Sequence, residues 1–358
     1  MKSASTPRLL ALALAAGAAS LAHAQSAPSV TLYGLLDAYV EYRTHNNAAG
    51  DSRTALNSGG MNTSRWGMRG SEDLGGGLKA IFQLEGELSL DTGAGGSSLF
   101  GRQANVGLEG GFGRVIAGRS YSTSYDFILP FDPMGYAPVY SWATSAGATG
   151  ARKDGMVTGV SNLVKYRGKV GGFSFGASYG FGEQAGSFSD GHTVNLGASY
   201  AAGPLAVVAT VEQINGVSDA TTGARDKTRT AHIGASYAFG DTVKLFGVLR
   251  DYSKEFGAGG DDNDSRTWWI GANWLPMPGL TLTAAYYAQD IRSSNVAPTV
   301  DDPSLIVLRA RYALSKRTDV YATLGYADGK DGVVGLSRDD VTFGSDQTGV
   351  AVGIQHRF

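Results

Sequence analysis

The chain of 358 residues contains no cysteine and only 10 prolines. Without cysteine, no disulfide can stabilise the fold, and no thiol can serve as a nucleophile or a metal ligand. After the first two dozen residues there is no run of eighteen apolar residues, so no later segment is predicted to cross a bilayer as a helix. A strong charge of one sign is also missing, because 30 basic residues face 32 acidic ones. This balance gives no reason to expect nucleic acid as a partner.

The first 24 residues have the layout of a secretory signal peptide. Lys2 and Arg8 precede an apolar run from Leu9 to Leu21, and Ala22-His23-Ala24 then supplies a cleavage site before Gln25. We therefore expect residues 1–24 to be removed and residues 25–358 to form a single domain. With no later helical span, the exported product is expected to be either a soluble protein or a β-barrel.

Alternation of apolar and polar residues is the dominant pattern in the rest of the chain. The 52 glycines and 17 tyrosines, with few prolines, favour strands and tight turns over helices. Between Val30 and Tyr42, one face carries Leu32, Leu36 and Val40, and the other carries Asp37 and Glu41. Similar two-faced segments occur at 173–181 and in the last ten residues. Each is predicted to be a strand that contacts a different solvent on each side.

The connections between these segments alternate between short and long, which is typical of an outer-membrane barrel. Sixteen strands result, and strands that run into short turns end on aromatic residues such as Tyr200, Trp274 and Phe358. A barrel of this size encloses an aqueous channel. The predicted lumen face is polar and charged; it carries Lys79, Gln83, Glu85, Glu87, Lys244, Arg250, Arg309 and Arg311. The fold class is therefore all-β: a sixteen-stranded antiparallel transmembrane β-barrel.

One long connection, from Arg119 to Val160, shows neither a strand nor a helix period. A segment of this length without structure in a compact domain is usually functional. We predict that this third external loop folds into the pore, where Asp126 and Asp132 would face the passing solute. A mobile flap on the outer surface is the alternative.

Several segments resemble the general diffusion porins of Gram-negative outer membranes, most closely the β-proteobacterial type. The resemblance rests on LYG at Leu32 to Gly34, on the segments 64–87 and 101–113, on AGRSY at Ala117 to Tyr121, and on the terminal Phe358. It implies a homotrimer in the cell outer membrane, in contact with lipid and lipopolysaccharide. It also implies passive diffusion of ions and small hydrophilic solutes through an eyelet, without a cofactor.

In that family, acidic side chains of the loop oppose an arginine cluster on the barrel wall. By this resemblance Arg65 and Arg119 match wall arginines, and Arg102 matches a third basic position. Asp126 and Asp132 supply the acidic side. Two positions depart from the pattern: Leu35 and Gly159 stand where relatives carry a basic residue. Arg152, Lys153 and Arg167 are candidate substitutes; for each arginine, an ordinary role in pairing at the surface is the alternative.

Two other functions stay open at this stage. The first is a channel selective for sugars or carboxylates, for which a row of aromatic side chains along the lumen would be the structural sign. The second is an enzyme or adhesin built on a barrel. GASYG at Gly176 to Gly180 has the letters of a nucleophile elbow, but it lies within a strand rather than between a strand and a helix. The acidic run Asp261 to Asp264 lacks the sharp-turn glycine of a calcium loop, and we predict no metal site and no enzyme.

Overall fold

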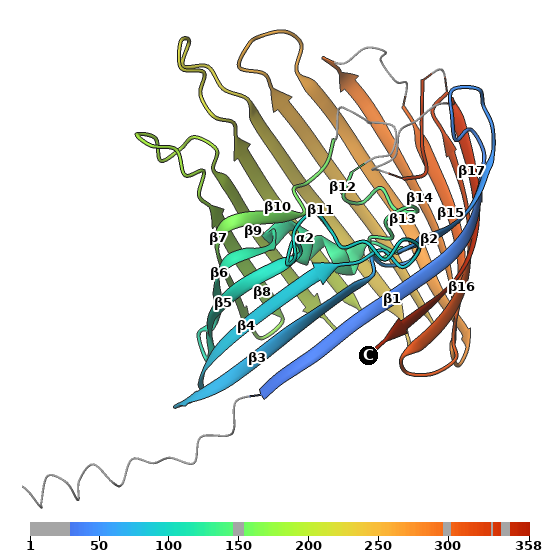
Figure 1. Ribbon diagram of the computed structural model, residues 1–358, viewed down its shortest axis with the longest axis horizontal. Helices are drawn as coiled ribbons and strands as arrows, with labels where there is room; N and C mark the ends of the chain where they lie inside the picture. Colours follow the sequence, from blue (N-terminus) through green and yellow to red (C-terminus); the bar gives the residue numbers. More distant parts are fainter. Residues whose placement is uncertain (1–28, 146–153, 296–301, 331, 338–343) are drawn as a thin grey trace, which may run out of the picture.

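The structure, a computed structural model, describes residues 29–145, 154–295, 302–330, 332–337 and 344–358. The predicted signal peptide lies outside these residues, and so do Arg152 and Lys153. The described chain forms one antiparallel sheet that closes on itself as a barrel (Figure 1). In the described residues no helix is long and apolar enough to cross a membrane.

The barrel has sixteen antiparallel strands. The sheet contains β1 (Ser29–Arg43), β2 (Arg53–Ser58), β3 (Arg65–Gly75), β4 (Leu78–Glu87), β5 (Gln103–Gly110), β6 (Gly113–Tyr121), β7 (Gly159–Val170), β8 (Phe173–Gly180), β9 (Thr193–Ala202), β10 (Leu205–Asn215), β11 (Lys227–Phe239), β12 (Val243–Glu255), β13 (Asn263–Met277), β14 (Leu280–Ser293), β15 (Ser304–Ala313), β16 (Thr318–Asp328) and β17 (Asp346–Arg357). One wall strand is split, because β2 and β3 pair with successive parts of β1. The pairing of β1 with β17 closes the ring.

The split strand corrects one expectation. The sequence pattern predicts a long connection from His45 to Asn62, but residues 53–58 pair with β1. The intervening residues 59–64 leave the wall because Asp37 on β1 binds the backbone amides of Gly60, Met61 and Asn62. The first external loop is therefore shorter than predicted.

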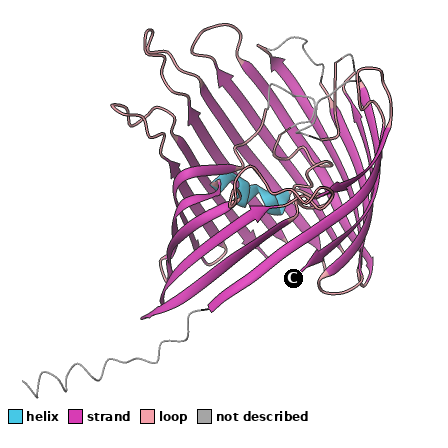
Figure 2. Cartoon of the chain, viewed as in Figure 1, coloured by secondary structure: helices cyan, strands magenta, loops and turns pink. Residues whose placement is uncertain are grey.

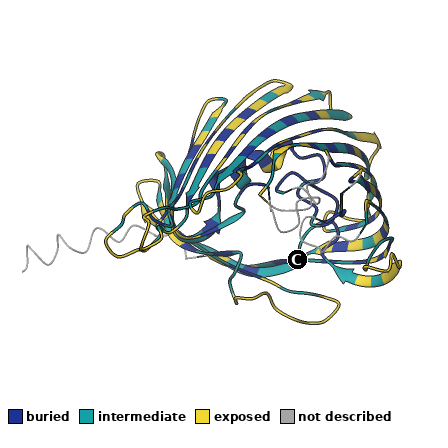
Figure 3. Ribbon diagram, turned by 90° about the horizontal axis from the view of Figure 1, so that it is seen from above, coloured by how far each residue is buried: buried dark blue, intermediate teal, exposed yellow. Residues whose placement is uncertain are grey.

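The two faces of the sheet follow the predicted alternation. Apolar side chains such as Leu32, Ile233 and Val352 are exposed on the outside, whereas Asp37 and Gln355 are fully buried on the inside. Figure 3, which looks down on the barrel, shows buried and exposed residues alternating along the strands. Since a strand turns successive side chains to opposite faces, this alternation separates a lipid-facing surface from a lumen.

The segment from Ser122 to Thr158 is termed the constriction loop, and its described parts, residues 122–145 and 154–158, lie inside the barrel (Figure 2). The prediction of an infolded loop is thus confirmed. The expectation that it lacks regular structure is wrong, since it contains α2 (Thr123–Ile128) and the 3₁₀ helix η2 (Leu129–Phe131). The Ser122 hydroxyl caps α2 by accepting a hydrogen bond from the Tyr125 amide.

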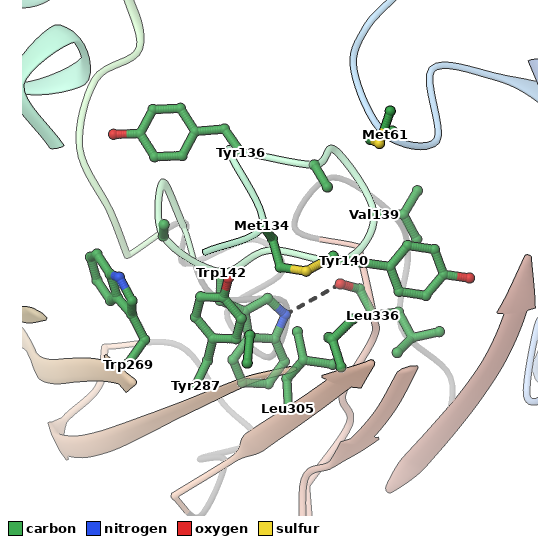
Figure 4. Packing of buried hydrophobic residues seen from close by; sticks show 14 of the residues in the cluster. Met61, Met134, Tyr136, Val139, Tyr140, Trp142, Trp269, Tyr287, Leu305 and Leu336 are labelled. Atoms are coloured by element: carbon green, nitrogen blue, oxygen red, sulfur yellow. Dashed lines mark hydrogen bonds between the residues drawn. The ribbon is translucent and has the colours of Figure 1, made fainter. Parts of the chain in front are cut away.

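The main hydrophobic cluster lies between the constriction loop and the wall behind it. Loop residues such as Trp142 pack against wall residues such as Trp269, Tyr287 and Leu305, all of them fully buried (Figure 4). The loop is therefore held as a packed element within the barrel.

Candidate functional site: the constriction loop and the wall it faces

Small residues on β8 and β9 make room for α2. The side chain of Phe127 lies so close to Gly176 and Gly197 that a Cβ built at either position would come within 2.9 Å of its ring. On both sides of this contact, hydroxyl groups tether the helix: Thr123 Oγ1 donates to Ser178 Oγ, and Ser124 Oγ to Asn195 Oδ1. The repeated Gly-Ala-Ser-Tyr runs thus form a seat for the helix.

Asp132 fastens the middle of the loop to the wall and does not face the solute. Asp132 as a whole is 5% exposed. It accepts hydrogen bonds from Tyr287 Oη on β14 at 2.5 Å, from Ser141 Oγ at 2.8 Å and from the Tyr136 amide at 2.7 Å. With these partners the carboxylate is saturated, so its role differs from the acidic eyelet residue that the sequence predicts.

A buried arginine on β12 holds the second half of the loop. Arg250 is fully buried and donates to the carbonyl oxygens of Trp142 at 3.3 Å, Ala143 at 2.8 Å and Asp154 at 3.4 Å. The carboxylate of Asp154 in turn accepts from Gln289 on β14. These contacts fix the loop against the strands from β8 to β15, so the free opening lies against the opposite wall.

Loop β16–β17 also supports the constriction loop. The indole of Trp142 donates to the carbonyl oxygen of Leu336 at 3.3 Å (Figure 4). Nearby, Tyr140 Oη donates to Glu41 on β1 at 2.7 Å. Burial, together with the charge of Glu41, raises the pKa of Tyr140, so this phenol stays a donor at any ordinary pH.

The wall that faces the loop carries two of the predicted arginines. Glu85 on β4 lies between them: Arg102 Nε is 2.8 Å and Arg65 Nη1 is 3.9 Å from the same carboxylate oxygen. Tyr33 Oη donates to the other oxygen at 2.9 Å. On the loop side, the carboxylate of Asp126 lies 2.5 Å from Lys165 Nζ on β7. Sequence reasoning missed the role of Lys165, because only the folded loop brings these two side chains together.

Three tyrosines form a row that begins beside Arg102: Tyr121 at the end of β6, followed by Tyr125 and Tyr136 in the constriction loop. Arg102 lies over the ring of Tyr121, with its guanidinium carbon 5.6 Å from the ring centroid. Tyr121 stacks on Tyr125 at 4.3 Å between centroids, and Tyr125 meets Tyr136 at 4.7 Å. The structure therefore has a short aromatic row beside the arginine wall.

The structure does not place Arg119 with the other predicted eyelet residues. Within β6, the side chains of Arg114, Ile116 and Ser120 line a cavity inside the barrel. Because successive residues of a strand point to opposite faces, Arg119 points outward between them. It pairs directly with Ala104 on β5, which shares this outer face. Arg119 therefore faces outward because side chains alternate between the two faces of β6.

Arg167 lies on the periplasmic side of the loop rather than at the opening. Its guanidinium carbon is 5.3 Å from the centroid of the Phe127 ring. Across the strand pair it faces Arg114. No group of three His, Cys, Asp or Glu side chains in the described ranges could hold a metal ion.

Comparison with known proteins agrees with this architecture. A family model described as "Gram-negative porin" matches residues 11–332. The chain is 36% identical to outer membrane porin protein 32 of Delftia acidovorans, covering 98% of this chain and 99% of that protein. It is 30% identical to an outer membrane porin of Bordetella pertussis with the same coverage.

Among solved structures, the anion-selective porin from Comamonas acidovorans superimposes with a TM-score of 0.79 at 32% identity, over 92% of this chain and all of that chain. The trimer form of OmpT from Vibrio cholerae gives a TM-score of 0.70 at 19% identity, over 93% of this chain and all of that chain, and therefore supports the fold alone. Members of this family are non-enzymatic channels of the outer membrane. The infolded loop, the closed sixteen-stranded barrel and these matches together show that the chain belongs to the Gram-negative porin family.

Proposed function

We propose that this porin, a channel for passive diffusion of small solutes, prefers anions and filters them at the opening between Arg65, Arg102 and the constriction loop. The observation that carries the preference is the pairing of the acids. Glu85 is shared by two arginines, Asp126 is neutralised by Lys165, and Asp132 is buried among donors.

Glu87 also lies at the opening, with its Oε2 3.8 Å from Arg102 Nη1, so Arg65 and Arg102 face two carboxylates there. The excess of positive charge on the lumen face comes from β15, where Arg311 shares Asp319 with Arg357 and Arg309 forms no ion pair within the described residues. Guanidinium groups stay ionised at any ordinary pH. In confined water, fixed charges act over longer distances than in bulk solvent, so the opening attracts anions. The similar porin from Comamonas acidovorans is anion-selective, which supports the same preference.

Replacing both Arg65 and Arg102 by glutamine is expected to shift the reversal potential in a salt gradient toward that of a cation-preferring channel. The matched control is Arg119→Gln, which removes the same kind of charge from the outward-facing position and should leave the reversal potential unchanged. Planar-bilayer recording in a potassium chloride gradient measures both. An equal shift in the control, or no shift in the double variant, would refute the proposed filter.

A second candidate function is selective transport of organic anions such as carboxylates. The stacked rings of Tyr121 and Tyr125 beside Arg102 favour it, because flat apolar surface next to a cation suits a carboxylate with a hydrophobic body. Tyr136 is only 5% exposed and packs against Tyr125. Saturable block of the chloride current by an aromatic carboxylate, weakened by Tyr125→Ala, would favour this candidate. If the aromatic carboxylate does not block the current, or if Tyr125→Ala does not weaken the block, the channel has no such selectivity and general diffusion remains its function.

We further propose that the protein assembles as a homotrimer within the outer membrane, where its remaining outer surface contacts lipid and lipopolysaccharide. The wall formed by β4, β5 and β6 is only 8 to 10 residues long, whereas β12, β13 and β14 have 13 to 15. Arg119 projects outward from this short wall, where it donates to the carbonyl oxygen of Gly101 and to Ser161 Oγ. A charged side chain that faces lipid costs up to about 2–4 kcal/mol, depending on its depth. Coverage by a neighbouring subunit removes this cost. Light scattering in detergent should give the mass of three chains, and a monomeric mass would contradict the assembly.

A further inference from the structure

A small cavity lies beneath the constriction loop, on the side of the short turns. Its volume is about 160 Å³, and its lining includes Arg114, Lys165, Arg167 and Asp126. The three cations face one carboxylate, which is already paired with Lys165. The cavity therefore carries an excess of two positive charges.

While the cavity is empty, the arrangement of Arg114 and Arg167 is electrostatically unfavourable. Arg114 on β6 and Arg167 on β7 are directly opposite each other on the lumen face, and like charges in that position repel. Glu109 on β5 lies opposite Arg114 on the other side, but it forms no ion pair with Arg114 in the described part of the chain. Neither arginine forms an ion pair or a hydrogen bond among the residues that the structure describes. In addition, Arg114 Nε is buried without a partner. An unpaired buried donor of this kind costs free energy unless a ligand or water accepts from it.

A neutral hydrogen-bond donor, the side chain of Gln103, also lines the cavity. Gln103 on β5 accepts from Asn105 through its amide oxygen at 3.0 Å, which leaves its amide nitrogen free to donate toward the same cavity. Two guanidinium groups and this amide therefore line one cavity, and donors of this kind suit an inorganic oxyanion.

We propose that this cavity is a binding site for a small inorganic oxyanion of the sulfate or phosphate class, separate from the opening formed by Arg65 and Arg102. The bound anion relieves the repulsion between Arg114 and Arg167 and accepts from both. The site lies next to the conducting path, so its occupancy reduces the local positive charge and lowers the chloride current. It goes beyond the proposed anion preference, because it concerns different side chains on the other side of the loop.

The test uses sulfate as the probe and the folded full-length barrel in planar bilayers. Potassium sulfate, added from the side of the short turns, should lower the chloride current along a saturating curve. In Arg114→Gln combined with Arg167→Gln, the sulfate concentration for half of this effect should rise by about tenfold or more, since charge-assisted hydrogen bonds are lost. The matched control is Lys79→Gln combined with Lys169→Gln, which removes two charges from lumen positions outside the cavity lining.

A second variant keeps the proposal testable if the double variant fails to fold. Gln103→Leu leaves every charge in place, and it should raise the half-effect concentration of sulfate without changing the chloride current in the absence of sulfate. The proposal is overturned if wild-type current shows no saturable response, if the arginine variants respond as the wild type does, or if the lysine control shifts equally. A cation-preferring wild type that still shows saturable sulfate inhibition would refute the anion preference and support this site.

Discussion

Replacing Arg250 by methionine is expected to release the second half of the constriction loop into the opening and to give a noisier single-channel current with a lower mean. Methionine keeps an apolar stem of similar length but donates no hydrogen bond. The carbonyl oxygens of Trp142, Ala143 and Asp154 would then lose the guanidinium that they share in the wild type. Each buried acceptor left without a partner costs about 1–3 kcal/mol, which favours movement of the loop into the lumen.

Arg311→Met provides the control for this experiment. Arg311 also lies on the lumen face, and its only hydrogen bond in the described part of the chain is a long one, 3.5 Å, to Thr281. It should alter selectivity through its charge but leave current noise as in the wild type. If Arg250→Met gives a quiet channel of unchanged conductance, the guanidinium is not what holds the loop.

Asp37→Ala should cause a large loss of barrel stability. Asp37 is fully buried and accepts from Tyr321 Oη at 2.6 Å and Gln355 Nε2 at 2.9 Å, besides the three loop amides. Removing a buried charged acceptor from such a network costs about 3–5 kcal/mol. Urea unfolding in detergent, followed by tryptophan fluorescence, measures the loss.

The same substitution should also weaken ion selectivity, because residues 59–64 lead directly into Arg65. Glu87→Ala is the control for stability alone, since its side chain is 48% exposed and its carboxylate lies 3.8 Å from Arg102. We expect that control to change stability by no more than about 0.5 kcal/mol. Equal stability of Asp37→Ala and Glu87→Ala would show that the Asp37 network does not fix the inner wall.

The barrel itself could be predicted from the sequence because its signal is repetitive. Lipid outside and water inside impose the same period of two on every strand, as in 30–42 and 173–181, so single errors do not hide the pattern. The infolded loop was predictable for the opposite reason: it breaks this period for about forty residues.

The site was less predictable because local geometry and distant contacts decide it. Arg119 belongs to the segment that carries the family resemblance, yet the lumen-facing positions of β6 alternate with it and turn it outward. Asp132 was identified as a loop acid, but its pairing with Tyr287 depends on contact between segments 155 positions apart. No local pattern marks Arg250 or Trp269 as a contact of the loop, because Arg250 lies opposite His232 and Thr267, and Trp269 lies opposite Val248 and Tyr287.

The most direct test of the account is a disulfide between the constriction loop and the wall, in a chain that has no cysteine of its own. Thr123 Oγ1 and Ser178 Oγ are 3.0 Å apart, so cysteines at both positions should cross-link in the folded barrel. If the loop is already fixed there, single-channel conductance and reversal potential will be the same before and after reduction of this bond. Failure of the bond to form in folded protein, or a current that rises on reduction, would contradict a loop held permanently against the wall.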